Sequence, residues 1–179
     1  YTVPHRAFAH EDEIIIPSPM PQTQKSIEYQ LPYPGILPDN PLYSLKAIRD
    51  KVVDFLISDP KKKAEFSLLQ ADKRLNAGVY LFNSAKENDK KVNLAISTIS
   101  KAENYFFKSI MEIKKAKAQG VNISDLAGKL LTASEKHQEV ITSLERRSKG
   151  NIRESLVRER KRSEGFEKQA IELLSEKAQ

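Results

Sequence analysis

Residues 89–120 read DKKVNLAISTISKAENYFFKSIMEIKKAKAQG, and this stretch decides the fold class. Its large apolar residues recur at alternating spacings of three and four, which is the period of one face of an α-helix. This spacing predicts a long amphipathic helix that packs nearly parallel to its neighbours in a bundle. Gly120 is a residue that readily takes the left-handed conformation that ends a helix. The apolar positions are Val92, Ile96, Ile99, Phe106, Ile110 and Ile113.

The same period extends to both sides of this stretch. It predicts further helices at about 41–57, 60–87, 123–148 and 152–177. In residues 60–87 the predicted core face consists of Phe66, Leu69, Leu75, Val79 and Phe82, with Leu68 and Ala71 at its margin. Each predicted helix is preceded by a typical capping residue, twice with a proline after it: Asn40, Asp59, Asn88, Asn122 and Asn151. The fold class predicted is all-α, an elongated antiparallel bundle of four long helices plus one shorter helix, with an extended Pro-rich N-terminal arm.

The shorter helix, residues 41–57, is expected to lie against this bundle together with the arm. Its large apolar residues share one face of the helix. They are Leu42, Leu45, Ile48, Val52, Phe55 and Leu56.

The chain divides at about residue 40 into an arm, residues 1–40, and a bundle, residues 41–179. Eight of the nine prolines lie within residues 1–41, and proline excludes a long helix there. Two basic and five acidic residues give the arm a net charge of −3, so the bundle carries +9 of the total of +6. We expect the arm to dock on its own bundle or on a neighbouring copy. The residues expected to dock or to assemble are Ile14, Ile15, Ile16, Tyr33, Ile36 and Leu37.

The composition narrows the chemistry. Cysteine is absent from the 179 residues, which excludes disulfides, thiolate metal sites and cysteine catalysis. No glycine-rich phosphate loop is present, and no Glu stands three residues before a His, as a di-iron bundle would need. We therefore expect no enzyme activity, no cofactor, no metal and no small-molecule substrate. The longest apolar runs are also too short for a transmembrane segment.

Three histidines remain to be interpreted. His5 and His10 stand close to the acidic run 11–13, which allows a metal-binding arm, although the spacing matches no established site. His137 falls on the apolar face of the helix at 123–148 and is interpreted as a residue at the core edge with one nitrogen satisfied.

Residues 145–162 form the strongest basic stretch, with eight Lys or Arg against three Glu. One interpretation is a solvated helix face with paired charges, and the other is a surface for nucleic acid or another anionic polymer. The possible anion-binding residues are Arg146, Arg147, Lys149, Arg153, Arg158, Arg160, Lys161 and Arg162.

Two motifs carry a resemblance. Residues 31–46 read LPYPGILPDNPLYSLK, and residues 59–65 read DPKKKAE. Together they resemble an uncharacterised bacterial domain family marked by a Pro-Gly-Ile-Leu-Pro-Asp-x-Pro-Leu-Tyr segment. Members of that family typically follow a signal peptide, so the resemblance implies an extracytoplasmic protein, and a chain that starts at Tyr1 fits a removed leader. The resemblance implies no activity and no catalytic residue.

The function expected from the sequence is that of a non-enzymatic extracytoplasmic structural or interaction protein of the cell surface. Self-assembly through the N-terminal arm is one form of this expectation, with copies of itself as partners. The alternative is a binder of nucleic acid or another anionic polymer through residues 145–162. A metal-handling arm at residues 5–13 is the third.

Overall fold

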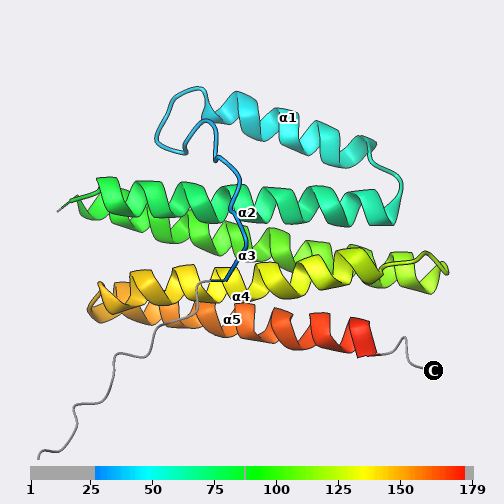
Figure 1. The fold of residues 1–179 in the computed structure, drawn as a ribbon. Coiled ribbons are helices and arrows are strands. Elements are labelled where there is room, and N and C mark those ends of the chain that lie inside the picture. Colours follow the sequence, from blue (N-terminus) through cyan, green and yellow to red (C-terminus); the bar gives the residue numbers. More distant parts are fainter. Residues whose placement is uncertain (1–26, 87, 176–179) are drawn as a thin grey trace, which may run out of the picture.

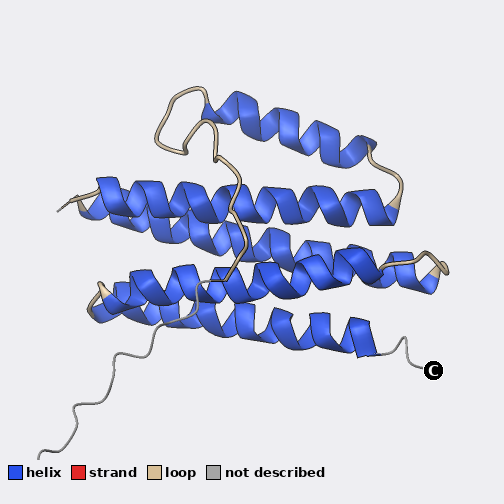
Figure 2. Cartoon of the chain, viewed as in Figure 1, coloured by secondary structure: helices blue, strands red, loops and turns tan. Residues whose placement is uncertain are grey.

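Five helices make up the structure, a computed structural model that describes residues 27–86 and 88–175 (Figure 1). Within these residues there is no strand, so the predicted all-α class is confirmed (Figure 2). The helices are α1 (Tyr43–Leu56), α2 (Pro60–Ser84), α3 (Asp89–Ala118), α4 (Ser124–Arg146) and α5 (Gly150–Ser175).

The four long helices form an elongated antiparallel bundle built from two hairpins, α2–α3 and α4–α5 (Figure 1). Between the hairpins, α3 packs mainly on α5 and α2 packs on α4, while α3 and α4 touch little. Short loops turn the chain at each end, so consecutive helices run in opposite directions. The shorter helix α1 lies outside this bundle, along α2.

The helix ends follow the predicted capping residues in part. The side chains of Asp59 and Asn88 accept hydrogen bonds from the backbone N–H of the third residue beyond, at 2.8 and 3.1 Å. Asn40 instead caps a turn, because its Oδ1 accepts from the N–H of Leu42 and α1 starts only at Tyr43. The prediction for Asn151 is wrong, since α5 begins one residue earlier.

The core consists of two apolar clusters, one toward each end of the bundle. Phe106 lies in the first cluster and stacks on Phe166 with a centroid separation of 5.0 Å. The predicted face of α2 is displaced, because Leu68 and Ala71 are fully buried whereas Leu69 is exposed.

Gly78 is also buried on α2. A Cβ at this position would lie 2.5 Å from Cγ1 of Ile99 and 3.2 Å from the carbonyl oxygen of Ala95. The missing side chain therefore lets α2 and α3 approach closely along this face. A glycine allows such a close approach because it has no side chain.

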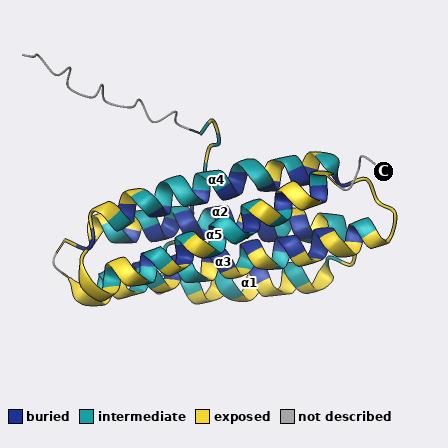
Figure 3. Ribbon diagram, turned by 90° about the horizontal axis from the view of Figure 1, so that it is seen from below, coloured by how far each residue is buried: buried dark blue, intermediate teal, exposed yellow. Residues whose placement is uncertain are grey.

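Helix α1 lies against the bundle with its polar side inward. Asp50 is its one fully buried residue, and Oδ2 of this aspartate lies 3.8 Å from Nη2 of Arg74 on α2. Asp54 pairs with Lys108 on α3. Five large apolar residues of α1, together with Leu42 just before it, consequently face outward. Much of the α1 ribbon is coloured as exposed in Figure 3.

None of the helices in the described residues combines the length and the apolar character that spanning a bilayer requires.

Candidate functional site

The segment before α1 crosses the bundle and is fastened to two of its helices (Figure 1). At its start, the N–H of Ile27 donates to Glu139 on α4 at 3.0 Å. The hydroxyl of Tyr29 then donates to Oδ2 of Asp72 on α2 at 2.6 Å. Further along, Nδ2 of Asn76 donates to the carbonyl oxygen of Pro32 at 3.0 Å. Residues 27–34 thus dock on their own bundle, which is one of the two alternatives left open by the sequence.

The same segment is also fastened to α1. Nζ of Lys46 donates to the carbonyl oxygen of Pro34 at 2.6 Å and to that of Ile36 at 3.2 Å. The segment therefore ties α1 to α2 and α4, although α1 itself has few contacts with the bundle.

Beneath the crossing segment lies a buried layer of three ionisable residues, one from each of three helices. His137 of α4 is 0% exposed, and its Nδ1 lies 2.7 Å from Oε1 of Glu103 on α3. Its Nε2 lies 3.1 Å from Oδ1 of Asp72 on α2. By position along its helix, each residue falls between members of the two apolar clusters. The layer thus separates the two halves of the core.

The geometry favours a protonated histidine. Only the imidazolium form can donate from both ring nitrogens, one to each carboxylate. Burial alone lowers the pKa of His137, but the charge of Glu103 and the hydrogen bonds to Asp72 and Glu103 outweigh it and raise the pKa to about 9. With the ring protonated, the layer holds one positive and two negative charges.

Tyr29 completes this layer from the crossing segment. Burial, the charge of Asp72 and the hydrogen bond to it together raise the pKa of the Tyr29 hydroxyl well above its ordinary value. The hydroxyl therefore stays a hydrogen-bond donor at neutral pH. Asp72 consequently links the position of the segment to the interior of the bundle.

This layer orders the core but presents no reactive group to a substrate. The ring of His137 is enclosed, and Phe106 packs edge-on against it with a centroid separation of 5.0 Å. The expectation that His137 lies at the core edge with one satisfied nitrogen is therefore wrong, because it is central and both nitrogens face carboxylates.

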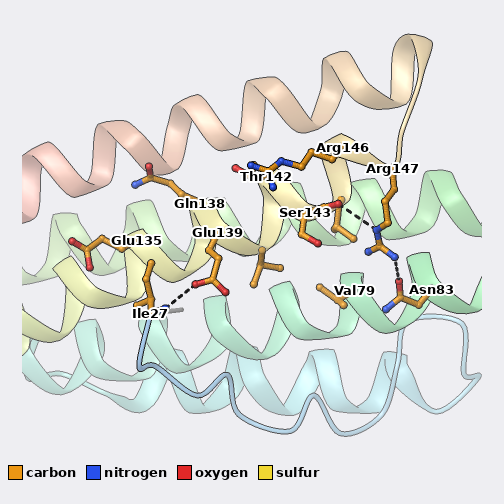
Figure 4. Close-up of a pocket in the computed structure, with 12 residues that line it drawn as sticks. Ile27, Val79, Asn83, Glu135, Gln138, Glu139, Thr142, Ser143, Arg146 and Arg147 are labelled. Carbon is orange, nitrogen blue, oxygen red and sulfur yellow. Dashed lines mark hydrogen bonds between the residues drawn. The ribbon is translucent and has the colours of Figure 1, made fainter. Parts of the chain in front are cut away.

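A groove of about 840 Å³ opens where the crossing segment meets α4 (Figure 4). One end is acidic, with Glu135 and Glu139, and Ile27 lies beside them. The other end carries Arg146 and Arg147, and the side chain of Arg147 donates to Asn83 across the groove. Charges of both signs and an apolar floor give the groove no single preferred ligand class.

At least three of the eight basic residues in the stretch 145–162 form ion pairs with acids of the bundle. Arg160 pairs with Glu145 and Glu164, Arg153 also pairs with Glu145, and Arg162 pairs with Glu159. Exposed basic residues also stand in this stretch, and these are Arg146, Arg147, Lys149, Arg153, Arg158 and Lys161. Ion pairs thus engage at least three of the eight predicted anion-binding residues, and anion binding by this stretch stays a prediction.

The residues of the arm that were predicted to dock differ in how far they are buried. Tyr33 is 75% exposed and Ile36 is also exposed, while Leu37 is half-buried. Buried Pro34 and the half-buried Tyr29 and Leu31 make the closer contacts. Ile14, Ile15 and Ile16 lie outside the described residues, as does the proposed metal arm with His5 and His10. Within the described residues, no group of three or more His, Asp or Glu side chains could hold a metal ion.

The fold and the site define a helical-bundle protein with a buried charged layer and a crossing segment that connects to the outer helix α1. Residues 35–151 match the family described as "Domain of unknown function (DUF5667)", and because this is more than half of the chain, the protein belongs to that family. No curated protein and no solved structure matches the chain. The family match covers α1 to α4 and only the first residues of α5.

Two features of this site escaped the sequence interpretation, although one had a signal. Asp72, Glu103 and His137 each occupy an apolar position in a three-and-four spacing. Their apolar neighbours are Leu68 and Leu75, Ile99 and Phe106, and Ala133 and Val140, respectively. A polar residue at such a position in three neighbouring helices indicates a buried polar layer. The outward orientation of α1 had no comparable signal.

Proposed function

We propose that the protein is a non-enzymatic interaction module and that its working surface is the outer face of α1. The observation that carries the proposal is the exposure of five large apolar side chains on this one helix and of Leu42 just before its first residue. Contiguous exposed apolar surface of this kind marks interaction sites. The residues, which we call the α1 face, are Leu42, Leu45, Ile48, Val52, Phe55 and Leu56.

Contacts on the inner side of α1 hold the helix in position on the bundle. Asp50 and Asp54 fix the inner side of α1 to α2 and α3, and Lys46 fixes its first turns to the crossing segment. An interaction surface on a positioned helix loses less conformational freedom on binding than one on a mobile segment. The buried layer around Asp72 then serves to hold the segment that positions α1.

We also propose that the module works outside the cytoplasm, at the cell surface. The support is the resemblance of residues 31–65 to a family whose members typically follow a signal peptide. Fractionation of the cells that make the protein tests this, with recovery from the cytoplasm alone as the contrary result. Self-assembly through the N-terminal arm, residues 1–40, remains a separate proposal, since residues 1–26 of it lie outside the described ones.

A photo-crosslinking amino acid at position 55 tests the proposed surface in cells. The side chain of Phe55 is 84% exposed, so the replacement leaves the fold intact. The matched control carries the same group at position 111, where Met111 is an exposed apolar residue on α3. We expect adducts with protein or lipid at position 55 that are absent at position 111. Equal labelling at both positions would contradict an interaction role for the α1 face.

A further inference from the structure

The α1 face is both apolar and unusually wide for an exposed helix surface. At about 100° per residue, its six side chains fall within an arc of about 140°. Phe55 and Leu56 are 84% and 69% exposed, and no described residue of the chain covers them. This width suits a helix that lies on an apolar layer, because such a helix buries one whole side.

Charged residues border this arc with a consistent sign. Lys51 lies beyond one edge and Lys46 beyond the other, whereas Arg49 falls just inside the arc, as their positions around the helix place them. Lys51 and Arg49 are exposed, and Lys46 is half-buried with its ammonium group on backbone carbonyls.

The acids of α1 point the other way. Asp50 is buried against Arg74 and also accepts from Arg49, and Asp54 is paired with Lys108. The outward side of α1 is therefore apolar in the middle with basic residues at its edges, and both acids of α1 itself are paired on its inner side. Long cationic side chains at the edges of an apolar helix face can extend their charges to a polar boundary while their stems stay on the apolar surface.

From this arrangement we infer that the α1 face binds the surface of an anionic lipid bilayer, with α1 parallel to the membrane plane. Apolar side chains would enter the boundary of the acyl chains, and the bordering cations would meet anionic headgroups. A second copy of the chain fits less well, because pairing two α1 faces would bring the bordering cations of both copies together. The inference rests on the proposed function of the α1 face as an interaction surface and names the partner of that surface.

Vesicle binding by the full chain tests this inference. The probes are unilamellar vesicles of phosphatidylglycerol and phosphatidylcholine in equal parts, and vesicles of phosphatidylcholine alone. We expect sedimentation with the anionic vesicles at low salt and at least tenfold weaker partition to the neutral ones. The double variant Ile48→Ser, Phe55→Ser should lose at least tenfold in partition to anionic vesicles, and the charge reversal Lys51→Glu should lose severalfold.

A matched control shows whether the loss of vesicle binding is specific to the α1 face or follows from removing any exposed apolar side chains. Met111→Ser with Ile171→Ser removes two exposed apolar side chains from α3 and α5, and it should bind anionic vesicles like the unaltered chain. Helical circular dichroism and melting temperature show that each variant is folded.

Fluorescence gives an independent reading of the site. The chain contains no tryptophan, so Phe55→Trp introduces a single fluorophore on the α1 face. Its emission should shift to the blue when anionic vesicles are added, whereas that of Met111→Trp should stay unchanged.

Several results would overturn the inference. One is an absence of binding to anionic vesicles, and another is equal binding by the Ile48→Ser, Phe55→Ser variant. A dimer in light scattering that this variant abolishes would identify a second copy as the occupant. Protein adducts at position 55 without vesicle binding would refute the lipid partner while leaving the proposed interaction role standing.

Discussion

The charge of the buried His137 can be tested directly, because the chain contains only three histidines. The substitutions His5→Gln and His10→Gln leave His137 as the sole imidazole of an otherwise complete chain. Neither position lies within the described residues. The nitrogen and carbon resonances of the ring then report its protonation without overlap.

The magnitude follows from the two carboxylates that face the ring. In the unfolded chain the pKa is near 6.5, and in the folded protein it is about 9. Between these values the folded state holds one proton more, so the free energy of unfolding falls as the pH rises, by about 1.4 kcal/mol per unit. This contribution is fully present below pH 6.5 and is lost above pH 9. Across that interval it amounts to about 3 kcal/mol.

Two measurements check this expectation. NMR titration of the sole-histidine chain should show both ring nitrogens protonated at pH 7 and a pKa near 9. Urea unfolding should show the decline in stability when it is measured at a series of pH values from about 6 to about 9.5. This interval extends about half a unit beyond each of the two pKa values. In His137→Gln the unfolding free energy should be lower and nearly independent of pH in this range.

The reasoning would be refuted by a neutral ring at pH 7 or by a stability that is flat or rising between pH 7 and 9. A neutral ring would mean that the two carboxylates do not outweigh the effect of burial on the imidazole. The NMR result stands even if His137→Gln fails to fold, because it needs no change in the buried layer.

Three further predictions concern helix packing, the crossing segment and the basic stretch 145–162. Gly78→Ala should destabilise the protein by about 1–3 kcal/mol in urea unfolding, because its Cβ would lie 2.5 Å from an isoleucine on α3. Gly165→Ala, where a Cβ would meet nothing within 4 Å, should instead stabilise α5 by about 0.5–1 kcal/mol. A loss of stability in both variants would contradict the close approach. Tyr29→Phe should cost about 1–3 kcal/mol and speed proteolysis of the crossing segment, since it removes the donor to a buried carboxylate. Tyr33→Phe, at an exposed position, is its control and should change neither quantity. Duplex DNA should bind residues 145–162 weakly, with a shallow salt dependence of a few phosphate contacts at about 0.9 log units each, because acids engage several of the arginines. Tight binding that survives high salt, measured by fluorescence anisotropy, would disprove it.

Much of the fold could be predicted from local patterns. The spacing of Ile99, Phe106, Ile110 and Ile113 predicted α3 and its buried face, and all four are fully buried. Asp59 and Asn88 marked helix starts because a cap acts on N–H groups only two or three residues away. Prolines excluded a long helix before residue 41. Such signals depend only on residues that are close in the sequence, so they can be recognised without the tertiary structure.

The candidate site depended on partners far apart in the sequence. A helix pattern shows which residues share a face. Which face turns inward depends on the side chains that the neighbouring helices present to it. Arg74 and Lys108 offer charge to Asp50 and Asp54, and this turned the polar side of α1 inward.

The amino-acid sequence by itself thus determined the helices and their approximate lengths. Only the tertiary structure decided that His137 meets carboxylates from two other helices and that α1 exposes its apolar residues. The physical reason is the range of the forces involved. Helix formation is governed by contacts within one or two turns, whereas the free energy of a buried charge depends on every group that surrounds it after folding.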